Sequence, residues 1–223
     1  MVNKEVWQKL HNEFAAKGVI LVAVSKTKPV SDIQELYTSG QRDFGENYVQ
    51  ELTEKQAQLP QDIHWHYIGH LQSNKVKDIA SFVYLIHAVD SFKLLLEINK
   101  QALKIGRIID VLLQMYIADE ETKFGLDEKE IIVLLDYYEA RKKDLQNVRI
   151  CGLMGMATNT EDEKQVHTEF FRLHNFFTLL ADTSFFGKPW FSICSMGMSA
   201  DYEIAIQEGS NMVRIGSMLF GRR

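Results

Sequence analysis

The sequence has little proline, little cysteine and no excess of positive charge, and each shortage argues against a class of protein. Three prolines in 223 residues, without any low-complexity stretch, leave no place for a linker between domains. The two cysteines, Cys151 and Cys194, lie inside apolar runs, as is typical of small buried side chains in a reducing compartment. A net charge of −5 cannot neutralise a phosphate backbone, which argues against nucleic acid as a partner.

The sequence also lacks a long uninterrupted hydrophobic run. Its longest near-apolar segment, residues 108–118, contains Asp110 and Gln114 and is too short to span a bilayer. The first residues carry no apolar signal core. We therefore expect a soluble, cytoplasmic protein with no membrane partner, folded as a single domain over residues 1–223.

What the sequence does contain is a regular alternation of strand-like and helix-like segments. Apolar residues at helical spacing over 3–16 precede the first strand-like run and predict an extra N-terminal helix. The predicted strands are 19–26, 43–47, 63–69, 83–89, 108–117, 148–154, 190–194 and 212–215, with helices between them. Strict alternation indicates a parallel sheet, and eight such units in 223 residues predict an α/β fold, a single (β/α)8 TIM-type barrel. A doubly wound open sheet is the second choice, but no G-x-G-x-x-G follows the first strand.

The first predicted strand ends in a lysine. Val22, Val24 and Lys26 share one face because side chains alternate along a strand, and Pro29 ends the run. An ammonium group above two valines must reach water, meet an anion or lose its proton. A lysine with a lowered pKa can form a Schiff base with an aldehyde, whereas the plainer interpretation is a solvated residue after a strand.

Two segments near the end of the sequence predict an anion site. In barrels of this type, phosphate commonly binds to the loops after strands seven and eight. The glycines and hydroxyl residues at these places are Ser195, Gly197, Ser199, Gly216 and Ser217. In a closed barrel strand eight lies beside strand one, so a ligand bridging the lysine and this site would carry a carbonyl and a phosphate. Pyridoxal 5′-phosphate and a phosphosugar both fit that description.

Six short motifs occur in a fixed order along the chain. They are Val24–Pro29, Phe44–Asn47, Trp65–Lys75, Gly152–Met156, Ser195–Asp201 and Arg214–Ser217. Together they resemble the YggS/PROSC family of pyridoxal-phosphate-binding proteins, whose fold is similar to the N-terminal barrel of alanine racemase. The resemblance runs nearly from end to end of the chain.

The resemblance implies a role for several residues. Lys26 would hold the cofactor as an internal aldimine, and Asn47 would lie beside its ring. The residues implied to bind its phosphate are Ser195, Ser199, Gly216 and Ser217. Arg214 matches an arginine that faces the pyridine nitrogen in the racemase barrel. A cation opposite that nitrogen weakens the ring as an electron sink, an inference that depends on Arg214 meeting the nitrogen and not the phosphate.

The function implied by the resemblance is pyridoxal phosphate homeostasis without substantial turnover. Alanine racemase has a further domain that supplies a second acid/base, and we expect its absence after Arg223 to make racemisation inefficient. The expected partners are the cofactor and apo-enzymes that depend on it, and we expect a monomer. The alternatives are a minimal pyridoxal-phosphate-dependent racemase or decarboxylase, a lysine aldolase acting on a phosphosugar, and an interaction protein that uses the cofactor as a signal.

Other candidate residues have plainer interpretations. His64, His66 and His70 show no cysteine or carboxylate at ligand spacing nearby, and we expect no metal site. Lys28 and Lys123 follow predicted strands, and we expect both to line the entrance to the site in contact with solvent.

Overall fold

The computed structural model of the chain describes residues 2–118 and 125–221. Over these residues, eight parallel strands close into a barrel in which each strand pairs with the next and β8 pairs with β1. The strands are β1 (Ile20–Val24), β2 (Asp43–Glu46), β3 (His64–Tyr67), β4 (Leu85–Val89), β5 (Ile109–Gln114), β6 (Val148–Met154), β7 (Ile193–Met198) and β8 (Met212–Ile215). The predicted (β/α)8 barrel is confirmed.

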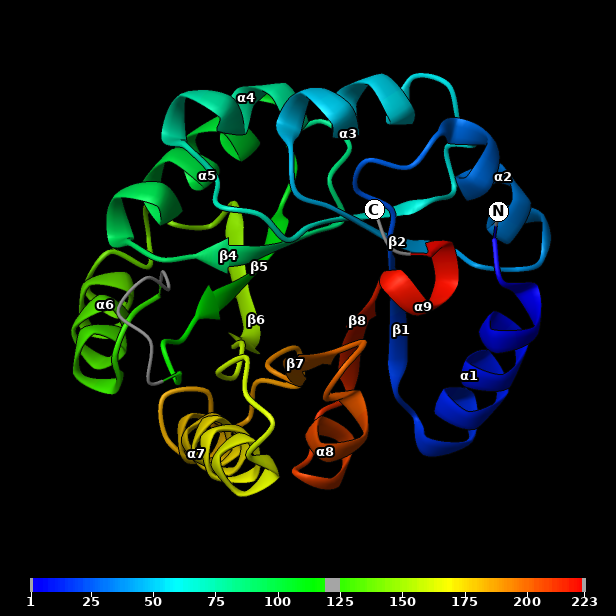
Figure 1. Cartoon of the computed structure of the whole chain (residues 1–223). Helices are drawn as coiled ribbons and strands as arrows, with labels where there is room; N and C mark the ends of the chain where they lie inside the picture. Colours follow the sequence, from blue (N-terminus) through cyan, green and yellow to red (C-terminus); the bar gives the residue numbers. More distant parts are fainter. Residues whose placement is uncertain (1, 119–124, 222–223) are drawn as a thin grey trace.

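Helices surround the barrel and cover its outer face (Figure 1). They are α1 (Lys4–Lys17), α2 (Val30–Thr38), α3 (Val49–Gln56), the 3₁₀ turn η1 (Ser73–Lys75), α4 (Val76–Ile79), α5 (Phe92–Lys104), α6 (Glu128–Ala140), α7 (Glu163–Asp182), α8 (Tyr202–Gln207) and α9 (Ser217–Phe220). Because all strands are parallel, their C-terminal ends meet at one mouth of the barrel, here called the C-terminal mouth, and their N-terminal ends meet at the other. In the part of the chain described, no helix is both long and apolar enough to cross a bilayer.

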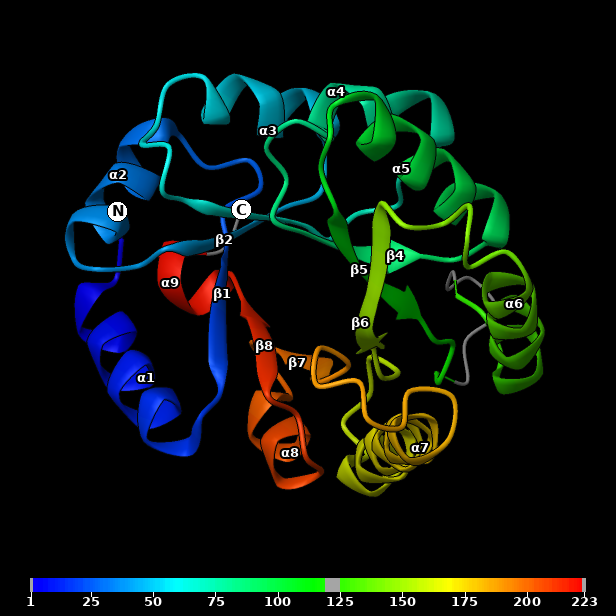
Figure 2. The same ribbon diagram turned by 180° about the vertical axis from the view of Figure 1, so that it is seen from behind.

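The extra N-terminal helix, α1, is confirmed and lies beside β1 (Figure 2). The side chain of Asn3 caps it by accepting from the backbone N–H of Val6 at 3.1 Å. The indole N–H of Trp7 donates to the buried side chain of Gln41 at 2.9 Å. The backbone N–H of Asn3 donates to the carbonyl of Leu219 in α9 at 2.8 Å. The first and last helices are therefore fastened to each other beside β1.

The barrel interior is packed mainly with apolar side chains. They are Val22, Leu85, Ala88, Leu112, Cys151, Met154 and Met212. A separate, larger apolar layer fills the space between the strands and the helices. Arg214 lies in register with Val22 and is buried, as are His66, His87 and Ser195. Polar groups therefore enter an otherwise apolar interior, where each must find a partner.

The predicted bounds of strand seven, 190–194, are wrong. β7 begins at Ile193 and continues to Met198. Phe191, which reads as part of an apolar strand, instead stacks on Phe185 before the strand begins, with ring centroids 3.9 Å apart. The later strand places Ser195 inside β7, although the sequence predicts it in the following loop.

Candidate functional site

The candidate site lies at the C-terminal mouth, where β7, β8, β1 and β2 are neighbours (Figure 1). A Cβ atom built on Gly216 would lie 3.3 Å from the Cβ of Val24. The loop after β8 therefore passes directly against the end of β1, two residues before Lys26. Closure of the barrel brings together segments from opposite ends of the sequence.

Lys26 is half-buried in a turn that follows β1. On one side of it, Ser25 is buried, its backbone N–H donates to the carbonyl of Gly45 at 3.0 Å, and its hydroxyl donates to Glu46 at 2.6 Å. On the other side, Thr27 has a φ of 63°, in the left-handed region that a β-branched residue rarely adopts. The backbone N–H of Thr27 donates to the carboxylate of Glu51 at 2.6 Å. Both neighbours of Lys26 are thus held by acidic side chains.

A second lysine, Lys55 of α3, joins these acidic groups beneath the turn. Its buried ammonium donates to the carbonyl of Ser25, to Glu46 and to Glu51, each at 2.7 Å. Burial raises the pKa of the Glu46 carboxyl, and the charge and hydrogen bond of Lys55 oppose that shift. We call Glu46, Glu51 and Lys55 the acidic clamp. Sequence reasoning missed it, although the spacing of Glu51 and Lys55 on one predicted helix was a usable signal.

Asn47 follows β2 at the same mouth. Its side-chain oxygen is buried and has no hydrogen-bond partner among the described residues. A Cβ atom on Gly69 would lie 2.2 Å from the Asn47 carbonyl oxygen, so the two segments approach too closely for any side chain at Gly69. This contact fixes the backbone of Asn47 and leaves a buried acceptor available to a ligand.

The loops after β7 and β8 touch through Ser199 and Gly216. The hydroxyl of Ser199 accepts from the backbone N–H of Gly216 at 3.3 Å. Gly197 has a φ of 93°, and a Cβ atom there would lie 2.5 Å from the Cβ of Ala205 in α8. Ser217 is exposed at the start of α9, where the first backbone N–H groups of a helix have no intrahelical partner. The structure therefore brings Gly197, Ser199, Gly216 and Ser217 to one place beside β1.

Ser195 and Arg214 lie below this loop, in the barrel wall. One guanidinium nitrogen of Arg214 donates to the Ser195 carbonyl at 3.0 Å and to its hydroxyl at 2.8 Å. The other donates to the carbonyl of Gly155 at 3.1 Å. Burial lowers the pKa of Arg214 to about 10, and the charge of Asp201 opposes the shift. Arg214 remains a cation at neutral pH, held at the floor of the site.

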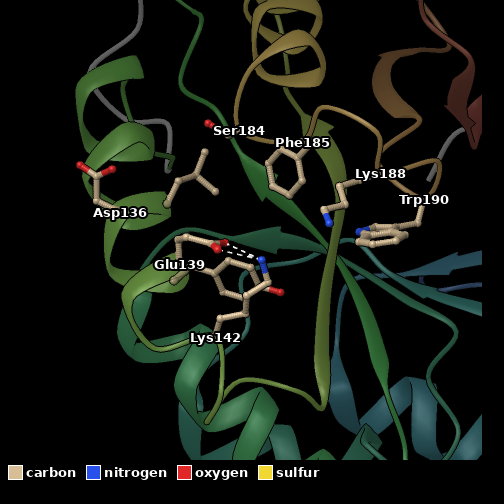
Figure 3. Close-up of a pocket in the computed structure, with 9 residues that line it drawn as sticks. Asp136, Glu139, Lys142, Ser184, Phe185, Lys188 and Trp190 are labelled. Atoms are coloured by element: carbon tan, nitrogen blue, oxygen red, sulfur yellow. Dashed lines mark hydrogen bonds and ion pairs between the residues drawn. The ribbon is translucent and has the colours of Figure 1, made fainter.

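Two hollows in the described surface differ in their relation to this mouth. One, of about 800 Å³, lies between residues 156–163 and 198–204, at the C-terminal ends of β6 and β7. The other, of about 380 Å³, is lined by α6 and by residues 184–190, which precede β7 (Figure 3). Its side chains include Trp190, Lys188 and an ion pair between Glu139 and Lys142 at 2.7 Å. Because its loop enters β7 from the opposite end, this second hollow is not part of the candidate site.

The remaining candidates lie outside the centre of the site. The ammonium of Lys28 donates to the carbonyl of Gly221 at 3.2 Å, and Lys123 lies outside the described residues. Asp43, on a neighbouring strand, contacts His64 at 3.2 Å and His66 at 2.9 Å, contacts that the spacing of residues along the sequence does not reveal. Over residues 2–118 and 125–221, no group of three or more His, Cys, Asp or Glu side chains could hold a metal ion.

The candidate site thus combines a parallel barrel, a lysine after the first strand and glycine–serine loops after the last two strands. A family model described as "Alanine racemase, N-terminal domain" matches residues 4–223. A curated relative from Aquifex aeolicus, named "Pyridoxal phosphate homeostasis protein", is 39% identical over 204 residues, covering 91% of this chain and 86% of that protein. A relative of the same name from Pseudomonas aeruginosa is 39% identical over 204 residues, covering 91% and 84%. The chain belongs to the family of pyridoxal phosphate homeostasis proteins.

A solved structure extends the comparison to three dimensions. PipY of Synechococcus elongatus PCC7942, with pyridoxal phosphate bound, superposes with a TM-score of 0.79 at 34% identity. The match covers 94% of this chain and 99% of that one. The resemblance drawn from the six sequence motifs is confirmed.

Proposed function

We propose that this chain binds pyridoxal 5′-phosphate at its C-terminal mouth and serves the homeostasis of that cofactor without substantial turnover of its own. The observation that carries the proposal is the clamped turn of Lys26 beside the contact between Ser199 and Gly216. Gly216 approaches Val24, two residues before Lys26, so the lysine and the two loops border the same mouth. The names of the curated relatives and the cofactor bound in PipY support the same function.

The residues at the mouth fit this cofactor. Its aldehyde would bond to the amine of Lys26, and its phosphate would lie on the loops of Gly197, Ser199, Gly216 and Ser217. Asn47 offers a buried acceptor without a partner, as expected for a group that contacts a ligand. Pyridoxal phosphate supplies an electrophilic carbonyl and an aromatic electron sink. We assign Asn47 and Arg214 to its ring, and Ser195 to the support of Arg214 and the phosphate loop.

The residues of this chain favour holding the cofactor over driving chemistry with it. The acidic clamp fixes the backbone on both sides of Lys26, so its amine is presented with little loss of conformational entropy. Arg214 keeps its positive charge at neutral pH, and a cation beside the ring opposes protonation of the ring nitrogen. We propose that the protein works as a monomer in the cytoplasm and passes the cofactor to apo-enzymes. Two free buried thiols support a reducing compartment.

Absorbance of the purified protein mixed with pyridoxal phosphate tests the proposal. The wild type should become yellow and lose that colour on borohydride reduction, and Lys26→Ala should remain colourless. Lys28→Ala is the matched control, because Lys28 lies two residues away and should leave the colour unchanged. Equal colour in wild type and Lys26→Ala would overturn the assignment of Lys26. Substantial turnover of any amino acid by the loaded wild type would overturn the non-catalytic function.

A further inference from the structure

Five polar side chains form an unbroken chain through the barrel. At the N-terminal mouth, Asp43 contacts Nε2 of His66 at 2.9 Å. Nδ1 of His66 contacts Nε2 of His87 at 2.9 Å, and Nδ1 of His87 lies 3.4 Å from the hydroxyl of Ser195. That hydroxyl accepts from Arg214 at 2.8 Å. The chain therefore links Asp43, at the mouth remote from the candidate site, to the arginine at the floor of the site.

The two ends of the chain fix the direction of every hydrogen bond in it. An arginine only donates and a carboxylate only accepts. Ser195 accepts from Arg214, so its own proton is directed to Nδ1 of His87. His87 then carries its proton on Nε2 and donates to Nδ1 of His66, which carries its proton on Nε2 and donates to Asp43. With both rings neutral and Asp43 ionised, only this arrangement gives each contact one proton.

Burial disfavours a charged ring at His87. His66 and His87 are fully buried. Burial lowers the pKa of His87 well below its usual value, and the positive charge of Arg214 adds to that effect. Burial alone would raise the pKa of Asp43, but its interactions with His66, led by their hydrogen bond, and with His64 outweigh burial, so that the pKa is lowered. Asp43 is accordingly ionised over the neutral range.

We propose that Asp43, His66 and His87 are positioning residues that hold Arg214 through Ser195. The hydroxyl of Ser195 is a strong acceptor for Arg214 only while His87 accepts its proton, and bonds in such a chain strengthen one another. Breaking the hydrogen-bond chain at His87 leaves buried polar groups without partners and weakens the hold on the guanidinium, which keeps its bonds to the carbonyls of Ser195 and Gly155. The hydrogen-bond chain exists in the barrel without ligand. Only its effect on cofactor retention rests on the proposed function.

The first test needs no cofactor. Long-range ¹⁵N–¹H NMR should show His66 and His87 as neutral rings protonated on Nε2. Asp43→Asn should shift the ring signals of His87, which Asp43 does not touch, and Asp62→Asn is the control. Asp62 lies at the same mouth but pairs with Arg42 and Tyr37. A His87 ring protonated on Nδ1, or one that Asp43→Asn leaves unchanged, would overturn the proposal.

The second test compares two substitutions of His87. The amide of His87→Gln can both accept from Ser195 and donate to His66, whereas His87→Leu can do neither. His87→Leu should speed hydrogen exchange at the Arg214 side chain and release of bound pyridoxal phosphate, each roughly five- to tenfold, as for the loss of one hydrogen bond. His87→Gln should remain near the wild type.

Equal effects of the two variants would show that His87 only fills volume, and would overturn the positioning role. If His87→Leu does not fold, the ring signals of Asp43→Asn and His87→Gln still decide the matter. If the wild type binds no pyridoxal phosphate, the proposed function fails. Hydrogen exchange at the Arg214 side chain and the tautomers of His66 and His87 still test the hydrogen-bond chain.

Discussion

At the scale of single residues, the turn that carries Lys26 is held by side chains that lie far from it in sequence. Lys55 is the centre of the acidic clamp, because one ammonium group donates to two carboxylates and a backbone carbonyl. Its side chain is only 6% exposed, so water cannot replace these contacts easily. The strained Thr27 conformation persists because Glu51 accepts a hydrogen bond from the backbone N–H of Thr27.

Lys55→Met is therefore expected to destabilise the protein strongly. It leaves the carboxylate of Glu46 buried without its cation, a change that costs about 3–5 kcal/mol for buried pairs. Lys17→Met is the control, because Lys17 pairs with Glu13 on the surface of α1 and such pairs contribute about 0.3–0.5 kcal/mol. Urea unfolding measures both. Similar losses of unfolding free energy in the two variants would contradict the clamp.

At the scale of elements, the site depends on two strand ends and the loops that leave them. The chain turns sharply after β7 so that Ser199 reaches Gly216, and α8 begins immediately beyond. Gly197 allows this course because its φ of 93° and its contact with α8 leave no room for a side chain. The loop and the helix are consequently one packed unit.

Gly197→Ala should displace α8 and loosen the Ser199 loop. Gly106→Ala is the matched control, since Gly106 also has a positive φ, 66°, but its added Cβ would meet nothing within 4 Å. Both variants carry the left-handed strain of about 1–2 kcal/mol. Gly197→Ala should lose about 1–3 kcal/mol more, because it also overpacks against Ala205. Thermal unfolding of the pair measures the difference, and equal melting temperatures would refute the close packing.

The sequence predicted elements better than the contacts between them. Alternating apolar runs predicted the barrel because each strand and helix has its own local pattern. The bounds of β7 were wrong because Phe191 is apolar yet packs on Phe185 in a turn, a distinction that hydrophobicity does not record. Asp43 contacts His66, and Lys55 contacts Glu46, across different helices and strands. The spacing of residues within one helix or strand therefore could not reveal these contacts.

At the scale of the whole molecule, Asp43, the carboxylate at one end of the buried hydrogen-bond chain, contributes to global stability. The pKa of Asp43 is lower in the folded state than its ordinary value, so folding favours the ionised carboxylate. Such a group stabilises the fold above its unfolded pKa of about 3.9, and the contribution is lost as pH falls through the folded pKa. The stabilisation is thus expected at neutral pH and lost in acid.

Asp43→Asn should remove this pH-dependent term. The difference in unfolding free energy between wild type and variant should be small near pH 3, grow towards pH 5 and then level off, as linkage requires for a lowered carboxyl pKa. Chemical denaturation at a series of pH values measures it. A difference that shrinks as pH rises would show that the carboxylate is disfavoured in the folded state.

Closure of β8 onto β1 has a consequence for protein synthesis. The segment with Lys26 leaves the ribosome well before Gly216 and the helix fastened to Asn3. Contacts between such distant segments form late and slowly, because the loop between them is nearly the whole chain. A nascent chain carries the lysine without the loops that we propose to hold the phosphate of the cofactor. The proposed binding site is therefore complete only after β8 has been made, and a translation product truncated before β8 is expected to bind no cofactor.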